Sequence, residues 1–311
     1  MDISFAALRN CTLCPRNCHS NRFVGKGAYC QTDYQYNISN VVIHRGEEPV
    51  ISGENGICNV FFAHCNLQCI YCQNHQISTN STYNDKHIWS FEQVLAAIQT
   101  CLDAGCQAIG FVSPSHQIPQ MVSVIKAFEH RHPKPIFVYN SNGYDKVEVL
   151  RRLEGLVDIY LPDMKYASNE LAATYSHAED YVQVSQLAIK EMYRQKGSAL
   201  HYADGHQAEW GLVVRHLVLP GHVDNSLEVL RWIARELSPK VHVSLMAQYF
   251  PTAKAAHRAP LNRTLSQEEY DSIVAEMEQL GMVNGWLQEM DSHKSYRPDF
   301  ELEEPFEGFR L

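Results

Sequence analysis

The sequence predicts an α/β protein built as an incomplete (β/α)6 barrel, with a small cysteine-rich segment at its N-terminus. Short β-rich runs alternate with segments of helical period, which is the pattern of βαβ units around a parallel sheet. Six such units are too few for a closed eight-stranded barrel, whereas right-handed crossovers still curl the sheet into an open one. Four of the ten cysteines fall within residues 1–38, which sets that segment apart.

The expected elements follow in order along the chain. A short strand at 40–44 comes first, and the six barrel strands are expected at 59–63, 108–112, 136–139, 157–161, 212–219 and 241–246. Ser90 and Gln93 resemble a capping box that opens a helix reaching about Asp103. The other helices are expected at 117–129, 146–153, 180–195, 227–237 and 268–280. We expect a surface loop at 197–209.

The chain thus divides into three parts: the cysteine-rich segment 1–38, the barrel 39–290 and the tail 291–311. The tail is acidic and irregular, and it either packs across the barrel or stays loose.

The composition is that of an ordinary globular chain. Its 311 residues are 45% hydrophobic and 20% charged, and the formal net charge is −9. Nucleic-acid binding depends on clustered positive charge, and the sequence has no run of Lys and Arg, so we expect no nucleic-acid partner. Asp2 lies where a signal peptide would be basic, and no apolar run approaches the length of a membrane span. We therefore expect a cytoplasmic protein with no membrane partner.

The N-terminal cysteines have the spacing of metal ligands. Cys11, Cys14 and Cys18 are separated by two and then three residues, and Cys30 closes the group. So small a segment has little core of its own and needs a metal to become ordered. Four thiolates suit a structural zinc ion, and an auxiliary iron–sulfur cluster is the alternative.

A second group of cysteines follows the first barrel strand directly. Cys65, Cys69 and Cys72 lie on one short loop. Iron–sulfur clusters normally take four cysteines, so a four-iron cluster on this loop would keep one iron open for another ligand. The alternative is a zinc ion held by the same thiolates and by His64 or His75. The other three cysteines are expected to be buried as small hydrophobes: Cys58, Cys101 and Cys106.

Polar residues also follow the later strands. Active sites of such sheets lie at the carboxyl ends of the strands. Each polar group alone is as easily a turn, a helix cap or a surface charge, but their repetition at successive strand ends favours a pocket. In chain order the groups are Asn140-Ser141-Asn142-Gly143, Asp163 to Lys165, Arg215, and Gln248-Tyr249.

The cysteine loop resembles the signature of radical S-adenosylmethionine (radical SAM) enzymes. In both, cysteines spaced by three and two residues follow a strand, with an aromatic residue, here Tyr71, between the last two. The resemblance implies a barrel of the radical SAM type, a 4Fe-4S cluster on the three cysteines, and S-adenosylmethionine (SAM) chelated by the open iron. It also implies reductive cleavage of SAM to methionine and a 5′-deoxyadenosyl radical that abstracts hydrogen. A reductant such as flavodoxin or ferredoxin is then an expected partner.

Nearly the whole chain is similar to radical SAM proteins related to the pyruvate formate-lyase activating enzymes. The shared stretches are Cys11 to Cys18, Gly46-Glu47-Glu48-Pro49, 141–144, 157–165, 215–221 and 244–251. This similarity implies that Tyr71 contacts the adenine, and that Lys165 and Arg215 hold polar groups of SAM. It further implies a monovalent cation near the SAM carboxylate, surrounded by Asn140, Ser141 and Asp163.

Two departures from the activating enzymes bear on these roles. Their Gly-Gly-Glu-Pro turn is replaced by Ser113-Pro114-Ser115-His116, so the contact to the SAM amino group falls to Ser113, Ser115 or backbone carbonyls. Asn140 replaces an aspartate, which weakens the cation site by one charge. Cluster and SAM binding remain expected, but the two departures weaken the argument that the substrate is that of the activating enzymes.

We therefore expect a radical SAM oxidoreductase that modifies a protein partner, as a glycyl radical activating enzyme does. An open barrel leaves a side opening for a polypeptide loop. Action on a small metabolite is the alternative. A non-catalytic electron-transfer or zinc-scaffold protein ranks last, because it leaves Asp163, Lys165 and Arg215 without a purpose. Fold alone does not decide between these functions.

Overall fold

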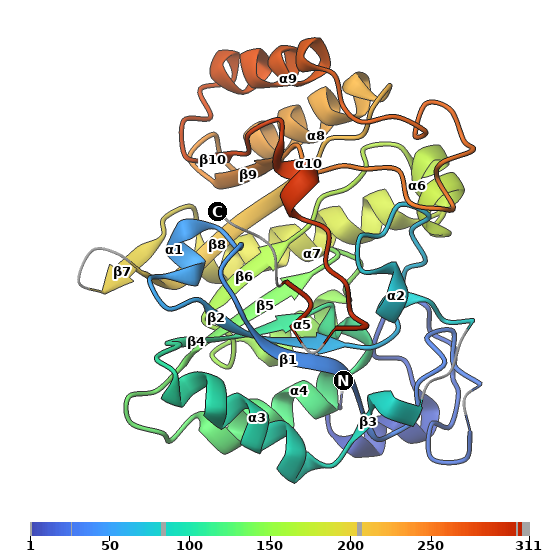
Figure 1. Ribbon diagram of the computed structural model, residues 1–311, viewed down its shortest axis with the longest axis vertical. Coiled ribbons are helices and arrows are strands. Elements are labelled where there is room, and N and C mark those ends of the chain that lie inside the picture. Colours follow the sequence, from blue (N-terminus) through green and yellow to red (C-terminus); the bar gives the residue numbers. More distant parts are fainter. Residues whose placement is uncertain (1, 26, 82–84, 204–206, 303, 307–311) are drawn as a thin grey trace.

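The computed structural model describes residues 2–25, 27–81, 85–203, 207–302 and 304–306. At its centre is a curved sheet in which the six expected strands run parallel and lie side by side in chain order (Figure 1). They are β2 (Ile57–Phe62), β4 (Ala108–Val112), β5 (Ile136–Ser141), β6 (Ile159–Pro162), β8 (Gln207–Leu217) and β9 (His242–Met246). The incomplete (β/α)6 barrel is confirmed.

Further strands extend both edges of this sheet. The expected N-terminal strand, β1 (Tyr36–His44), pairs antiparallel with β2, and the two-residue β3 (Ile88–Trp89) pairs with β1. At the other edge, β10 (Gly285–Leu287) pairs parallel with β9. The sequence did not indicate β3 or β10, because two or three residues carry no usable alternation.

The expected surface loop at 197–209 is partly wrong. β7 (His201–Ala203) pairs antiparallel with the first residues of β8, which itself begins at residue 207. Residues 204–206 lie outside the described part of the chain. The segment becomes a strand because β8 extends beyond the barrel and offers it hydrogen-bonding partners, a tertiary effect that outweighs weak β propensity.

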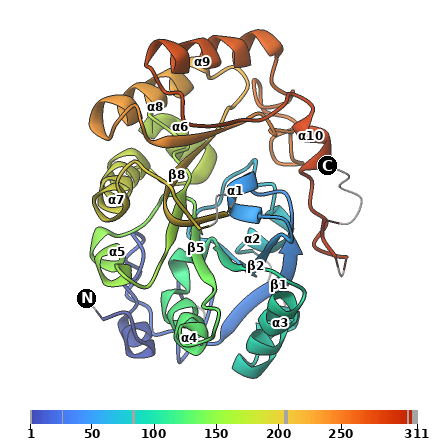
Figure 2. The same cartoon turned by 90° about the vertical axis from the view of Figure 1, so that its left-hand side faces the viewer.

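Helices cover the outer face of the curved sheet (Figure 2). The longer ones are α3 (Phe91–Asp103), α4 (Ile118–Phe128), α5 (Val147–Leu153), α6 (Asn169–Ser176), α7 (Tyr181–Lys196), α8 (Val223–Glu236) and α9 (Gln267–Gln279). Ser90 and Gln93 form the expected capping box, and Ser266 forms a second one with Glu269. The sequence did not predict α6.

Short helical turns complete the structure: η1 (Phe5–Asn10), α1 (Pro49–Ser52), α2 (His75–Ser78), η2 (Asp85–His87), η3 (Pro114–His116) and α10 (Ser292–Ser295). No helix in the described ranges is long and apolar enough to cross a membrane.

The middle of the sheet is buried on both faces. Every residue of β2 and of β4 is buried, as their continuous apolar runs predict for strands with covered faces. Because the barrel strands are parallel, their carboxyl ends meet at one edge. The loops that leave this edge after β2, β4, β5, β6, β8 and β9 therefore lie close together.

The two terminal segments pack on the barrel. Leu8 and Leu13 of the cysteine-rich segment are buried in the same apolar core as the barrel strands. In the tail, Phe300 and Phe306 pack against Phe61 of β2. Residues 303 and 307–311 of the predicted tail lie outside the described residues.

Candidate active site

A cavity of about 190 Å³ lies at the carboxyl ends of the barrel strands. It is lined by ten residues that the sequence predicted for the cluster, SAM and the nearby cation: Cys65, Cys69, Tyr71, Cys72, Ser113, Asn140, Ser141, Asp163, Lys165 and Arg215. Ser115, the alternative to Ser113, is buried but does not line the cavity. The loops after four strands (β2, β4, β5 and β6) and the Arg215 side chain of β8 contribute to this wall, and Met246 and Gln248 come from the end of β9. The structure thus brings together groups that lie 150 residues apart.

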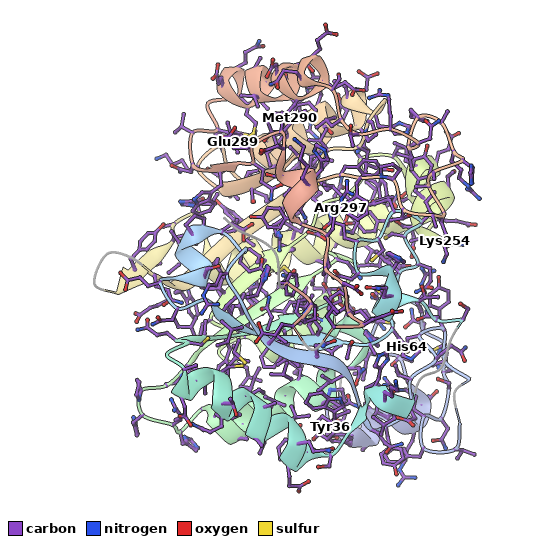
Figure 3. All side chains as sticks on the ribbon, viewed as in Figure 1. Tyr36, His64, Lys254, Glu289, Met290 and Arg297 are labelled. Carbon is purple, nitrogen blue, oxygen red and sulfur yellow. The ribbon has the colours of Figure 1, made fainter. Side chains whose placement is uncertain are left out.

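The three-cysteine loop (residues 65–72) begins just beyond β2. His64, labelled in Figure 3, adopts a left-handed conformation (φ 66°) that turns the chain out of the strand. The Asn80 side chain holds the first cysteine in place: its amide donates to the Cys65 carbonyl at 2.9 Å and its oxygen accepts from the Cys65 amide at 3.2 Å. Gln68 donates to the Ser78 carbonyl at 2.8 Å. The loop is therefore fixed before any ligand binds.

Each sulfur of this loop accepts a hydrogen bond from a polar side chain. Asn142 Nδ2 donates to Cys65 Sγ at 3.3 Å, and Ser176 Oγ donates to Cys69 Sγ at 2.9 Å. Ser78 Oγ donates to Cys72 Sγ at 3.3 Å. Hydrogen bonds to the sulfurs help set the reduction potential of an iron–sulfur cluster. The cysteine motif does not predict these donors, because all three lie outside it.

The thiols of Cys65 and Cys69 are hard to ionise in the absence of a metal. Burial, and then the neighbouring Cys69, raise the pKa of Cys65 to about 12. Burial also raises the pKa of Cys69 to about 11, against the opposing effect of the Lys165 cation. Thiolates at Cys65 and Cys69 are therefore unfavourable by themselves, and binding of a metal centre would stabilise them.

The donor set fits the expected cluster. Three soft sulfur ligands face one cavity, each with a hydrogen-bond donor, and a lysine lies beside Cys69. In the parts of the chain that the structure describes, no three Cys, His, Asp or Glu side chains already surround a common point. Loading a metal centre therefore requires the thiols to rotate. His75, one of the candidates for a fourth zinc ligand, is exposed at the start of α2.

Asp163 and Lys165, just after β6, form an ion pair whose charged atoms are 2.5 Å apart. Burial alone would lower the pKa of Lys165, but the Asp163 carboxylate and then the Cys69 thiolate raise it above its usual range. Lys165 therefore remains protonated beside the three-cysteine loop. A buried cation there suits the carboxylate of an amino-acid ligand.

Arg215 of β8 lies between two carboxylates. Its Nη1 donates to Glu47 Oε2 at 3.0 Å, and its Nε lies 3.4 Å from Glu48 Oε1. Burial alone would raise the pKa of Glu47, but the Arg215 cation lowers it below its usual value. Glu47 lines the cavity. The sequence indicated it only as part of the Gly46–Pro49 stretch shared with the activating-enzyme-related proteins. Arg215 reaches the predicted position, with its charge already balanced.

The residues of the predicted cation site lie together at the end of β5 and β6 but face different partners. The Asn140 amide points to Glu47 Oε1 at 3.5 Å. The Ser141 hydroxyl donates to Asp145 Oδ2 at 2.5 Å, and Tyr139 donates to Asp145 Oδ1 at 2.7 Å. Asp145 is fully buried, and burial raises its pKa. A cation site made by Asn140, Ser141 and Asp163 remains a prediction.

The remaining two predicted SAM contacts also lie at the cavity. Ser113 adopts a left-handed conformation (φ 54°) at the start of η3, and its amide donates to the Asn140 carbonyl at 2.8 Å. Tyr71 is buried, with its hydroxyl 2.6 Å from that of Tyr166 and its ring packed against Tyr249. An aromatic wall of this kind suits a flat purine ring.

The C-terminal tail covers part of the cavity. Tyr296, Pro298 and Phe306 line it, and the Phe306 ring lies 4.1 Å from that of His44. The tail is attached beside the three-cysteine loop, because the Gln76 side chain donates to Asp299 Oδ1 at 2.9 Å and accepts from the Phe300 amide. Of the two expectations for the tail, packing across the barrel is the one that the described residues show.

The four N-terminal cysteines do not reach the cavity. Cys11, Cys14 and Cys30 are buried, and Cys18 is partly exposed. The other three cysteines, Cys58, Cys101 and Cys106, are buried in the main apolar core, as expected for small hydrophobes.

Comparison with known proteins supports both the fold and the cluster. A family described as the 4Fe-4S single cluster domain matches residues 51–179, which include the three-cysteine loop. The HydG maturase of the FeFe-hydrogenase has a similar fold, with a TM-score of 0.51 and 13% identity over 77% of this chain. A variant of spore photoproduct lyase gives a TM-score of 0.50 and 11% identity, covering 79% of this chain and 80% of that one. The chain thus shares its fold with these two proteins, and its residues 51–179 match a 4Fe-4S single cluster domain.

An uncharacterized protein of Methanocaldococcus jannaschii is 29% identical over 284 residues, which cover 88% of this chain and 76% of that relative. The chain spans 54% of the HydG chain.

Proposed function

We propose that this protein is a radical SAM enzyme that uses reductively cleaved SAM to abstract hydrogen from a substrate, most favourably a protein. One observation carries the proposal. The three cysteines and the seven SAM or cation-site residues expected from the sequence, drawn from segments far apart in the chain, line the same cavity, and of the two serines offered for the SAM amino group Ser113 is the one that does so. A structural zinc site or a simple electron carrier would need the thiols but not the Asp163–Lys165 pair and Arg215 beside them.

The chain's own residues would bind and orient the two groups. Cys65, Cys69 and Cys72 would hold the 4Fe-4S cluster, and Lys165 and Ser113 would lie near the carboxylate and amino ends of SAM. When bound and reduced, cluster and SAM supply the cleavage to methionine and a 5′-deoxyadenosyl radical. The electron would come from an external carrier such as flavodoxin or ferredoxin. The buried walls would exclude water and stray hydrogen donors.

A protein substrate is supported by two features. The chain is similar to glycyl radical activating enzymes in the motifs quoted above, and its net charge of −9 disfavours a nucleic acid. The replaced turn at Ser113–His116 means that the partner need not be pyruvate formate-lyase.

A small metabolite is the second candidate, and one observation favours it. Tyr296, Pro298 and Phe306 of the tail already line the cavity, so a polypeptide loop would have to displace them, whereas a small molecule would not.

The test is an anaerobic assay of reconstituted, reduced enzyme with SAM, in which 5′-deoxyadenosine is measured. We expect slow cleavage alone and faster cleavage with the protein fraction of a cell extract. The Cys65→Ala/Cys69→Ala/Cys72→Ala variant is the control and should give no product. Absence of product with every reductant tried contradicts the enzyme proposal. If only the small-molecule fraction of the extract speeds 5′-deoxyadenosine formation, the substrate is a small metabolite.

A further inference from the structure

Arg22 is an unusual residue of the cysteine-rich segment. Its side chain is fully buried, and the structure gives it only neutral partners besides sulfur. Nε and Nη2 donate to the Asp33 carbonyl at 3.0 and 2.7 Å, and Nη1 donates to the His116 carbonyl at 2.6 Å. No carboxylate of the described residues forms an ion pair with it. A guanidinium is always charged, and burying one without a neighbouring anion costs roughly several kcal/mol of folding free energy.

The missing anion can be identified from what lies beside the guanidinium. Arg22 Nη1 is 4.0 Å from Cys11 Sγ. Cys18 Sγ lies 3.9 Å from the Cys11 carbonyl, and the Cys14 thiol is near enough to those of Cys18 and Cys30 for their charges to affect one another. As four neutral thiols, this group offers Arg22 no charge. As four thiolates around a divalent ion, it carries a net charge of about −2, by the ordinary charges of its parts.

We propose that the N-terminal cysteines form an anionic tetrathiolate zinc site and that the buried Arg22 is its counter-cation. Its four ligands are Cys11, Cys14, Cys18 and Cys30. This site is separate from the proposed catalytic function and does not depend on it. We assign one zinc ion rather than a cubane, because four thiolates with no open position are typical of structural zinc. In the described residues the four thiols do not yet surround a common point, so zinc binding requires them to rotate.

The protein environment suits a closed, structural site. Three of the four cysteines are buried, with exposed fractions of 5%, 8% and 5% for Cys11, Cys14 and Cys30. Thr32 Oγ1 lies 3.1 Å from Cys30 Sγ, and Ser20 Oγ lies 3.6 Å from Cys18 Sγ, so hydroxyl groups are placed to donate to thiolates. No coordination position is left for a substrate.

The cysteine-rich segment also contacts the three-cysteine loop. Between Cys14 and Cys18, Arg16 donates from Nε to the Asn66 carbonyl at 2.8 Å, inside the three-cysteine loop. Its guanidinium lies 3.9 Å from the Tyr29 ring, and Asn80 binds the carbonyls of both Tyr29 and Cys65. Arg22 in turn holds the η3 turn that follows Ser113. The cysteine-rich segment would therefore hold the three-cysteine loop and the η3 turn in fixed positions beside the cavity.

Metal content of the full-length protein, purified anaerobically, tests the proposal directly. We expect one zinc per chain in addition to the iron of the catalytic cluster. The Cys14→Ser/Cys30→Ser variant should lose the zinc and keep that iron, whereas Cys65→Ala/Cys69→Ala/Cys72→Ala should do the reverse. Iron equivalent to two clusters with no zinc would overturn the zinc assignment.

The role of Arg22 is tested by Arg22→Met, with zinc affinity measured by competition with a chromogenic chelator. We expect at least a tenfold loss of affinity, about 1.4 kcal/mol. Arg9→Met is the matched control, because Arg9 is an exposed arginine of the same segment that lies over the Phe23 ring and should have no effect. Arg22→Lys, which keeps the charge, should recover much of the zinc affinity. It replaces Arg22→Met as the test variant if Arg22→Met does not fold.

Replacing zinc by cobalt should give a tetrathiolate spectrum in the native protein. Unchanged zinc affinity in folded Arg22→Met would refute the counter-cation role.

Discussion

The two groups of cysteines have similar spacing but opposite surroundings. The three-cysteine loop lies at the edge where parallel strands end, faces a cavity and is surrounded by charged pairs from other strands. The four N-terminal cysteines do not line that cavity, and Cys11 adjoins the buried Arg22. An open coordination position distinguishes catalytic from structural metal sites. The comparison shows that location relative to the sheet, more than the number of thiols, separates the two expected roles.

The largest effect should come from removing the ligands of the three-cysteine loop. In Cys65→Ala/Cys69→Ala/Cys72→Ala we expect cluster iron and 5′-deoxyadenosine formation to fall to background, because no other thiol reaches the cavity. Iron analysis and low-temperature EPR with and without SAM measure this. Cys106→Ala, which removes a core thiol, is the control and should keep both. A SAM-responsive EPR signal in the triple variant would contradict the assignment.

The next largest effect concerns the charged wall of the cavity. Lys165→Met removes the cation beside Cys69, and we expect SAM affinity to fall at least tenfold with the cluster retained, since a charge-assisted hydrogen bond contributes about 1.5–3 kcal/mol. Calorimetric titration of the reconstituted protein gives the dissociation constant.

Lys134→Met is the matched control for this prediction. Lys134 forms a comparable ion pair with Asp158, but outside the cavity, so its loss should leave SAM affinity unchanged. Equal affinities in the wild type and Lys165→Met would show that Lys165 does not hold SAM.

A smaller effect is expected from the hydrogen bonds to sulfur. Ser176→Ala removes the donor to Cys69 Sγ, which leaves more electron density on the cluster. We expect a lower reduction potential at unchanged iron content, measured by redox titration monitored by EPR. Ser185→Ala is the control, because Ser185 donates within α7 to the Val182 carbonyl. A potential that is unchanged or higher in Ser176→Ala would argue against this role.

The smallest effect should follow substitution of a cysteine that belongs to neither group. Cys101→Ala removes a buried sulfur from the apolar core, and we expect a loss of only about 1 kcal/mol in the free energy of unfolding. Zinc and iron contents should stay at wild-type values, as measured by denaturant titration and metal analysis. Loss of either metal would show that the division of the cysteines is incomplete.

Local sequence was sufficient for much of the fold. The six barrel strands could be predicted because continuous apolar runs such as that of β4 mark strands buried on both faces. Ser90 and Gln93 marked one helix start through their capping box. The short elements β7 and β10 could not be predicted, because they form only where a neighbouring strand offers hydrogen bonds.

The sequence by itself determined which chemistry the protein can hold: cysteine spacing, polar residues at strand ends, and a parallel sheet that gathers those ends at one edge. Only the tertiary structure decided what each group faces. It placed Glu47 against Arg215, directed Asn142 and Ser176 to the sulfurs, and buried Arg22 beside Cys11. Such pairings join residues up to 168 positions apart, so they depend on packing in three dimensions, which no local pattern encodes.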